Sequence, residues 1–330
     1  MRNSNLKFST SRDVRAVVQS LRALHVPTPA FDDLSTHFGD LLAQRRADEA
    51  DGVAYNARGL ILVGDSGSGK TTALRELVRK YSSVMQTDPT QNLCEYIDLK
   101  VPSPATMKVV GAATLRALGY QFTSDTRQGP AIWDQVKVQL KLRSTKFLGF
   151  DEAQDLARYE TVKERQAVVN TLKSLMENSV FPVGLVLAGT SGLKKIVNQD
   201  VQLARRMRPV EISRLHAVRD VGHVIKIVSR YADRAGIETG ASLKSEAFAM
   251  RLMHAADYQF GLLTEITVEA VSKALFSDGF DAQLDVAHFV QVYHKRNGVS
   301  EWLNPFVAED YARIDPRRLF DDGAQEDDTQ

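Results

Sequence analysis

The sequence predicts an α/β fold in which a five-stranded parallel sheet lies between helices, followed by a small helical domain and an extended C-terminal arm. Up to residue 214, short apolar runs alternate with helical patterns, and this alternation is typical of parallel sheets covered on both faces. After residue 214 only the helical periodicity continues. The expected strands are 59–63, 93–99, 147–150, 183–188 and 209–212.

The same patterns divide the chain into four segments. Residues 1–50 are polar with apolar positions at helical spacing, interrupted by Pro27 and Pro29, and predict an N-terminal helical extension. Residues 51–214 hold the alternating strands and helices, and 215–295 form the helical domain. Residues 296–330 mix aromatic residues with acids and turn formers, which predicts an extended arm with an acidic, disordered tail.

Charge is distributed unevenly along the chain. The 330 residues carry 42 Lys and Arg against 41 Asp and Glu, a formal net charge of +1. The last 30 residues contain nine acids and three bases, so the preceding body has a net charge of +7. A basic body with an acidic tail is compatible with a protein that contacts nucleic acid locally.

Several classes of protein are excluded or disfavoured by composition. Cys94 is the only cysteine, which rules out disulfides within the chain and a cysteine-based zinc site and favours a reducing, cytoplasmic location. No run of 18 apolar residues exists, so we expect no membrane span. The seven histidines lack metal-ligand spacing, and no trio of acids typical of a DNA-cleaving enzyme is recognisable.

A phosphate-binding loop is the clearest functional motif. Residues 64–71 fit the pattern G-x-x-x-x-G-K-[ST], preceded by an apolar run and followed by a helical pattern. In such loops backbone N–H groups surround phosphates, the lysine reaches the β and γ phosphates, and the hydroxyl binds Mg²⁺. The alternative is a flexible glycine and serine turn. The expected ATP-binding residues are Gly64, Asp65, Ser66, Gly67, Ser68, Gly69, Lys70, Thr71 and Thr72.

Acidic and polar residues follow two later strands. Asp151 and Glu152 end the expected strand 147–150, so Asp151 would share the Mg²⁺ site with Thr71, and Glu152 would orient the attacking water. Glu152 therefore favours ATP hydrolysis over nucleotide binding alone. Thr190 ends the next strand, where a hydroxyl can contact the γ-phosphate; a simple strand-end turn is the alternative.

Arg205 and Arg206 precede the last expected strand. A guanidinium at this place can stabilise charge on the γ-phosphate of a neighbouring subunit, and we expect Arg206 to take this role ahead of Arg205. The alternative is a solvated basic helix end that favours the helix dipole.

Together these motifs resemble an AAA+ P-loop ATPase over about residues 20–280, with 215–295 as its helical lid. The strings at 63–71, 150–154, 187–190, 202–206 and 304–306 are further similar to the TniB/TnsC family, ATPase regulators of Tn7-like transposons, including CRISPR-associated ones. One departure is that 261–265 lacks the arginine that many AAA+ lids place there, and Arg251 cannot be assigned that role.

The resemblance implies a function. Such proteins bind ATP between subunits and assemble as rings or helical filaments on double-stranded DNA. They link a target selector, a TniQ-type protein in some systems, to a DDE transposase, and hydrolysis drives disassembly. Two alternatives stay open: an AAA+ initiator, loader or DNA-remodelling ATPase, and a signalling ATPase that uses nucleotide only to switch a protein interaction.

The sequence identifies residues that contact DNA or a partner less clearly than it identifies the nucleotide-binding residues. The insertion at 100–146 is basic, and the resemblance implies that it contacts DNA phosphates without reading the base sequence. The candidate DNA-contacting residues are Lys100, Lys108 and Thr123. The alternative is that the basic residues lie on solvated helix faces. The arm residues Trp302, Asn304, Pro305 and Phe306 would anchor a partner such as the transposase, or fold back onto the helical domain.

Overall fold

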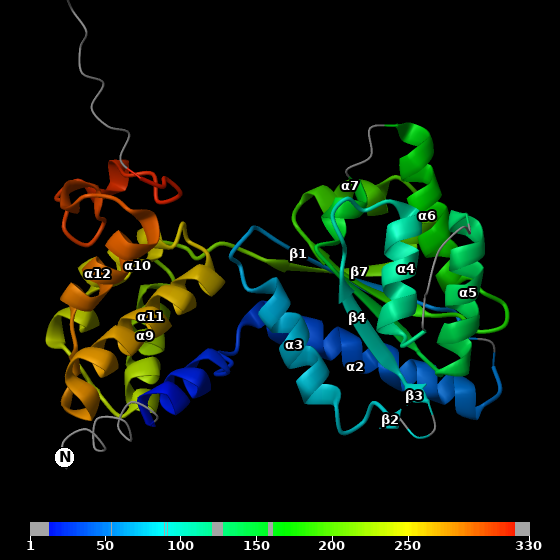
Figure 1. Cartoon of the computed structure of the whole chain (residues 1–330), viewed down its shortest axis with the longest axis horizontal. Coiled ribbons are helices and arrows are strands. Elements are labelled where there is room, and N and C mark those ends of the chain that lie inside the picture. The colour runs from blue at the N-terminus through cyan, green and yellow to red at the C-terminus, as the bar shows by residue number, and fades with distance from the viewer. Residues whose placement is uncertain are drawn as a thin grey trace, which may run out of the picture. The chain divides into compact units, whose positions relative to one another are not determined.

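The computed structural model describes residues 13–53, 55–88, 90, 92–120, 128–157 and 161–320, and within them the chain forms two compact units. The sheet unit contains Pro27–Ser66 and Lys70–Ser213. The helical unit contains the described residues up to Val26 and from Arg214 on, and Gly67–Gly69 are grouped with it. Figure 1 shows both units along the chain. Among the described residues, no helix combines the length and apolar character needed to cross a bilayer.

The sheet unit is built on five parallel strands in the order β4-β5-β6-β1-β7. The strands are β4 (Tyr96–Lys100), β5 (Phe147–Asp151), β6 (Gly184–Gly189), β1 (Gly59–Gly64) and β7 (Met207–Ile212). The first strand in sequence therefore lies between the last two. This order brings the carboxyl ends of β1, β5 and β6 to one edge of the sheet, where parallel sheets bind ligands.

The expected strand at 93–99 is divided in two. β2 (Thr87–Asp88) and β3 (Leu93–Cys94) form a short antiparallel pair, and β4 begins at Tyr96. Glu95 lies between them with a buried carboxylate that pairs with Arg46 at 3.2 Å and with Lys146 at 2.8 Å. An apolar periodicity could not reveal this interruption, because it depends on two cations from distant segments.

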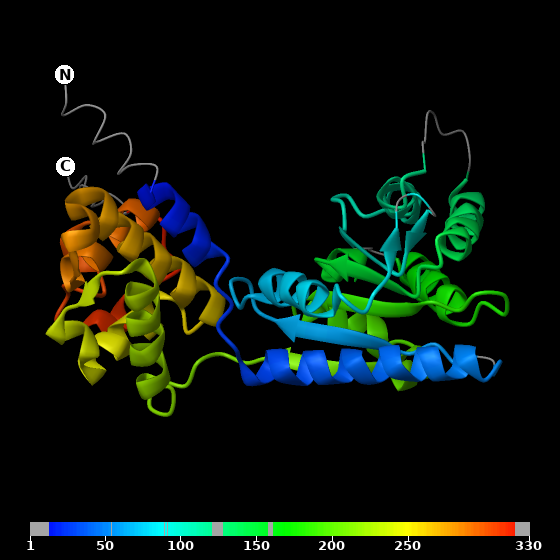
Figure 2. The same cartoon turned by 90° about the horizontal axis from the view of Figure 1, so that it is seen from below.

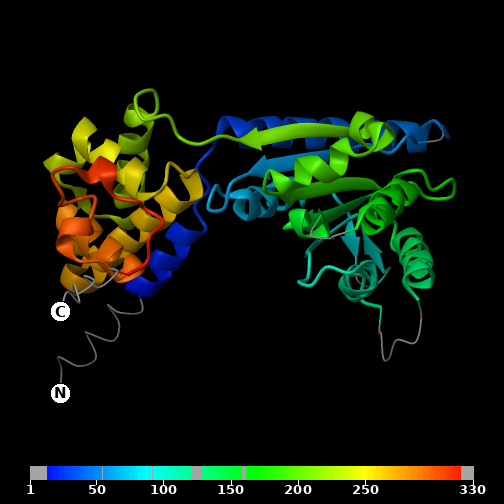
Figure 3. The ribbon, with the colours of Figure 1, turned by 90° about the horizontal axis from the view of Figure 1, so that it is seen from above.

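Helices cover both faces of the sheet, as Figures 2 and 3 show from opposite sides. On one face, α2 (Pro29–Ala50) and α3 (Lys70–Tyr81) pack against Leu60 and Leu62 of β1. On the other face, Ile61 and Val63 meet the opposite helix layer. Successive side chains of a strand point to opposite faces, so one apolar run supplies both cores. The second layer comprises α4 (Met107–Ala117), α5 (Gly129–Leu142), α6 (Val162–Met176) and α7 (Gly192–Asn198).

The N-terminal segment is not the single extension that was expected. Residues 13–22 are helical and belong to the helical unit, where Val14 and Leu21 are buried. Residues 24–28 are not helical, and α2 then begins at Pro29 with the Thr28 hydroxyl accepting a hydrogen bond from the Phe31 N–H at 3.2 Å. Proline suits the first helical position but not a helix interior, so Pro27 and Pro29 separate two helices with different partners.

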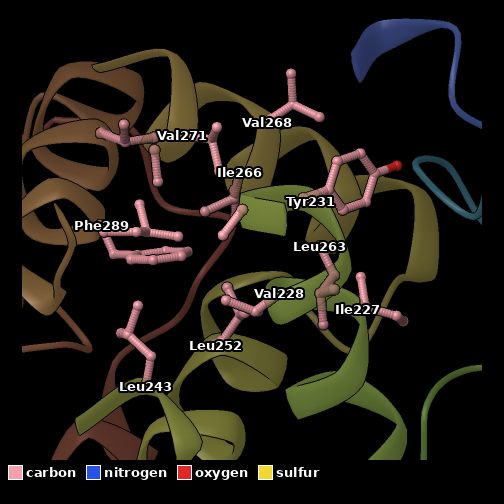
Figure 4. Packing of buried hydrophobic residues seen from close by; sticks show 14 of the residues in the cluster. Ile227, Val228, Tyr231, Leu243, Leu252, Leu263, Ile266, Val268, Val271 and Phe289 are labelled. Atoms are coloured by element: carbon pink, nitrogen blue, oxygen red, sulfur yellow. The ribbon is translucent and has the colours of Figure 1, made fainter. Parts of the chain in front are cut away.

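After residue 214, four helices join the helix at 13–22 around one apolar core. They are α9 (Val221–Ala235), α10 (Glu246–Ala255), α11 (Phe260–Asp278) and α12 (Val286–Asn297). Figure 4 shows the core, in which Val228 of α9, Leu252 of α10 and Phe289 of α12 are fully buried. The two-residue strands β8 (Glu238–Thr239) and β9 (Gln283–Leu284) pair in parallel beside it.

Candidate nucleotide site

The phosphate-binding loop connects β1 to α3 as predicted from its residues. Gly67 and Gly69 have φ angles of +77° and +100°, a backbone region that residues with a Cβ rarely adopt. The Ser68 hydroxyl is buried and has no hydrogen-bond partner among the described residues. An unpaired buried hydroxyl in a glycine loop is suited to a polar ligand such as a phosphate.

Lys70, the first residue of α3, points back into this loop. Its Nζ donates to the carbonyl oxygens of Gly64 and Asp65, each at 2.8 Å, and the side chain is buried. Burial lowers the pKa of Lys70, opposed by the carboxylates of Glu152, Asp151 and Asp65, which raise it. Within the described part of the chain the ammonium has hydrogen bonds to the two carbonyls and no ion pair, and a phosphate could take the place of either carbonyl.

A short hydrogen bond joins this loop to the acidic end of β5. The Thr71 hydroxyl donates to Asp151 Oδ2 at 2.7 Å, although 80 residues separate the two in sequence. The other oxygen, Oδ1, accepts the backbone N–H of Glu152 at 2.9 Å. A hydroxyl and a carboxylate oxygen are hard ligands of the kind that Mg²⁺ prefers, so these two residues fit the predicted metal position.

Glu152 has an unusual backbone. Its φ is +56°, a left-handed conformation that a non-glycine residue adopts at a cost of about 1 kcal/mol or more. This residue comes directly after β5, and its Oε2 accepts a hydrogen bond from Gln154 Nε2 at 2.6 Å. Such strain at a strand end next to a phosphate-binding loop is typical of functional residues.

One residue of the site was not assigned a role from the sequence. Gln154 lies in the short 3₁₀ helix Ala153–Ala157, and its Nε2 donates to Glu152 Oε2 at 2.6 Å. Its Oε1 accepts the backbone N–H of Thr190 at 3.1 Å. The structure thus brings Thr190, at the end of β6, into one hydrogen-bonded group with Glu152. The Thr190 hydroxyl has no hydrogen-bond partner among the described residues and is free for a ligand.

Comparison with known proteins places this site in a family. The family described as "Bacterial TniB protein" matches residues 14–217, which contain every residue of the site described so far. The match covers more than half of the chain.

This chain belongs to the TniB family.

Solved structures similar to this TniB protein show its fold. Cdc6p from Pyrobaculum aerophilum matches with a TM-score of 0.56 and 14% identity, over 82% of this chain and 69% of that one. ORC1 from Aeropyrum pernix, solved in complex with DNA, matches with a TM-score of 0.57 and 13% identity, over 86% and 69%. ORC2 from the same organism, with ADPNP and ADP, gives 0.57 and 11% over 84% and 69%. The predicted AAA+ P-loop fold is confirmed. A search of the curated proteins finds no match.

The two arginines expected near the γ-phosphate of a neighbour have different surroundings in the TniB fold. Both lie at the end of α8 (Val201–Arg206). Arg206 is engaged within its own unit, by hydrogen bonds to Asn56 and to the Ala57 carbonyl and an ion pair with Glu177 at 3.2 Å. Arg205 is exposed and has no ion pair with any described residue. The expected preference for Arg206 is therefore not favoured by the geometry.

The candidate DNA residues are spread apart. Lys100 ends β4 in register with Asp151 and lines an open pocket of about 590 Å³ together with Glu152 and Gln154. It is thus next to the nucleotide site rather than on a separate surface. Lys108 is exposed on α4. Thr123 lies outside the described residues.

The expected partner anchor is mostly inaccessible. Asn304 and Phe306 are 1% and 7% exposed, and Pro305 is also buried. The Phe306 ring contacts the ring of Phe289, with centroids 5.6 Å apart, and the Asn304 Nδ2 donates to the Val290 carbonyl at 2.9 Å. The extended arm was therefore the wrong expectation for these residues, and folding back onto the helical unit was the correct alternative. Trp302 alone of the four is exposed, at 73%.

Arg251, which could not be assigned from the sequence, holds this C-terminal segment. It donates to the carbonyls of Pro305 at 2.6 Å and Ala308 at 2.7 Å, and its guanidinium lies 4.5 Å from the ring centroid of Tyr311. The His254 ring contacts the Ile314 carbonyl at 2.8 Å. Arg251 therefore has a structural role inside the helical unit.

Proposed function

We propose that this TniB protein hydrolyses ATP and regulates transposition by assembling on double-stranded DNA, with ATP bound at the interfaces between its own subunits. The observation that carries the ATPase part is the 2.7 Å hydrogen bond between Thr71 and Asp151. It joins the phosphate-binding loop to the acidic strand end at the place where P-loop ATPases hold Mg²⁺.

Each residue of the site has a role in this proposal. The backbone N–H groups of the loop and Lys70 bind the phosphates, and Thr71 and Asp151 would hold a Mg²⁺ ion, which would supply positive charge against the phosphates. Glu152 orients and polarises the attacking water. The Thr190 hydroxyl contacts the γ-phosphate. Arg205, which is exposed at the end of α8, reaches the nucleotide of an adjacent subunit in a ring or filament.

DNA binding in the proposal is sequence-tolerant. It is supported by the TniB family and by the AAA+ fold shared with an ORC1 that was solved in complex with DNA. Lys108 and Arg116 are exposed on α4 and can contact phosphates. Contacts of this kind release counterions, so affinity for duplex DNA should fall steeply as salt rises. The TniB family further suggests a DDE transposase and a TniQ-type target selector as partners, and hydrolysis as the step that disassembles the complex.

Two variants test the proposal. Glu152→Gln removes water activation but keeps the size of the side chain, so ATP binding and assembly on DNA should persist while hydrolysis and release stop. Lys70→Ala removes the phosphate contact and should abolish ATP binding and assembly together. Lys195→Ala and Glu238→Gln are matched controls, because both side chains are exposed and lie outside the site. ATP turnover and sedimentation with duplex DNA measure the two effects.

Four results would contradict the proposal. A Glu152→Gln protein that leaves DNA faster than the parent in ATP would remove Glu152 from hydrolysis-driven release. Undiminished assembly of Lys70→Ala would exclude ATP-gated oligomerisation. Translocation or strand separation in ATP would instead favour the initiator, loader or remodelling alternative, and absence of duplex binding at low salt would favour a signalling ATPase.

A further inference from the structure

Gln154 connects two groups that the proposed reaction uses. Its side-chain amide donates to the Glu152 carboxylate at 2.6 Å and accepts the Thr190 N–H at 3.1 Å. The two strands involved, β5 and β6, are neighbours in the sheet, so a single side chain can reach both ends. Glu152 Oε2 is engaged by Gln154, which leaves Oε1 to accept a proton from water.

The orientation of the Gln154 amide follows from its partners. A backbone N–H can only donate and an ionised carboxylate can only accept, so the amide oxygen must face Thr190 and the amide nitrogen must face Glu152. With both ends of the amide engaged, the side chain has one favourable orientation. Glu152 itself has a strained backbone, with φ at +56°, and a fixed partner can hold it there.

The neighbouring strand provides space for this arrangement. Gly189, the last residue of β6, has no side chain, and a Cβ built at this position would lie 2.5 Å from Gln154 Oε1 and 3.0 Å from the Gln154 backbone nitrogen. Neither the loop nor the Mg²⁺ position requires a glycine here. Gly189 therefore permits the approach of Gln154 to the end of β6.

We infer that Gln154 is a positioning residue for ATP hydrolysis: it sets the Glu152 carboxylate in place relative to Thr190, so that the end of β6 and the water-activating group move as one. The inference rests on the proposed ATPase function. It predicts that Gln154 affects turnover rather than nucleotide binding, because among the described residues its side chain hydrogen-bonds Glu152, Asp155 and Thr190 and not the phosphate-binding loop.

Three variants separate positioning from general stability. Gln154→Ala removes the hydrogen bonds to Glu152 and Thr190 together with a longer one from Nε2 to Asp155 Oδ1 at 3.5 Å. Gln154→Glu keeps the size and the acceptor for Thr190 but places a second carboxylate against Glu152. We expect kcat to fall about 10- to 100-fold in each, since misplacement of a catalytic group by an ångström can cost that much. The Kd for a fluorescent ATP analogue should stay within about threefold of the parent. Gly189→Ala should reproduce the loss of kcat by displacing Gln154.

Matched controls and a double variant complete the test. Gln166→Ala changes an exposed glutamine paired with Asn170 on α6, and Gly222→Ala adds a methyl group where no atom lies within 4 Å; neither should alter kcat. If Gln154 acts through Glu152, Gln154→Ala should cause no further loss of the residual rate of Glu152→Gln.

The outcomes are distinguishable. An additive loss in the double variant, an unchanged kcat in Gln154→Glu, or a loss of nucleotide binding equal to the loss of kcat would overturn the positioning role. If Gln154→Ala fails to fold, Gln154→Glu, which keeps the volume, decides the matter. A parent protein that shows no ATP hydrolysis would contradict the proposed function itself, whereas a hydrolysing parent with unchanged Gln154 variants would contradict only this inference.

Discussion

Phe306 should stabilise the helical unit far more than Trp302, although the two aromatic residues are four positions apart. Phe306 is 7% exposed and its ring meets those of Phe248, Phe289 and Tyr293, with centroids 6.0, 5.6 and 6.2 Å away. Phe306→Ala would leave a cavity among these rings. Trp302 is 73% exposed, so Trp302→Ala is the matched control.

The expected magnitudes differ widely. Replacing a buried phenylalanine by alanine typically costs about 3–5 kcal/mol, the sum of lost transfer free energy and the cavity that remains. A substitution on the surface away from special features changes stability by less than about 0.5 kcal/mol. The free energy of unfolding falls by roughly 2–3 kcal/mol per molar urea, so the urea concentration at the unfolding midpoint of the helical unit should fall by about 1–2 M in Phe306→Ala.

Urea titration followed by circular dichroism measures the loss of helix in both variants. In Trp302→Ala the only tryptophan is Trp133, which is buried in the sheet unit, so the fluorescence of that variant gives a second signal from the other part of the chain. Equal midpoints for Phe306→Ala and the parent would refute the packing of residues 304–306 on the helices. A large loss in Trp302→Ala instead would show that the exposed ring has a partner in the folded chain.

Three further predictions concern charged residues. Arg206→Ala should lower the free energy of unfolding by about 1 kcal/mol, because it breaks hydrogen bonds within its own unit, whereas Arg205→Ala should spare stability and reduce ATP turnover only at protein concentrations that allow assembly. Burial raises the pKa of Glu49, but hydrogen bonds from Lys146 and Arg45 lower it, and the net result is a lowered pKa. The folded state therefore binds fewer protons than the unfolded one. The Glu49 carboxylate therefore stabilises the folded state at pH values above the ordinary glutamate pKa of about 4.3, and this stabilisation is lost as pH falls through the lowered pKa. The difference in unfolding midpoint between Glu49→Gln and the parent should shrink over the same pH range. Arg251→Met should make residues 305–318 more sensitive to limited proteolysis; an unchanged cleavage pattern would argue against its contacts.

The parts of the site that the sequence predicts are those encoded by neighbouring residues. The phosphate-binding loop is continuous from Gly64 to Thr71, and an acidic pair after an apolar strand is equally local, so spacing alone identifies both. Thr190 can be proposed as a phosphate-contacting residue because it too directly follows an apolar strand. In each case the residues follow a strand whose apolar run is visible in the sequence.

Other roles depend on contacts that spacing does not record. Gln154 bridges Glu152 and Thr190 only because β5 and β6 are adjacent, and strand order is a property of the whole sheet. Arg205 and Arg206 are neighbours on one helix turn, where successive side chains point about 100° apart, so one faces the protein and the other faces solvent. Phe306 and Trp302 are similar in composition and context, and only packing against α12 and α10 distinguishes them.

Besides the buried side chains of Asn304 and Phe306, the C-terminal segment is held through its main chain. Arg251 binds the carbonyls of Pro305 and Ala308, and the Asn297 side chain donates to those of Pro316 and Arg318. Carbonyl groups are common to all residues, so these four hydrogen bonds fix the number of residues between the positions, whereas the side chains of Ala308, Pro316 and Arg318 are not needed for them. Outside the buried residues 304–306, this segment should vary in sequence among relatives and keep its length, the reverse of what is usual for a surface loop.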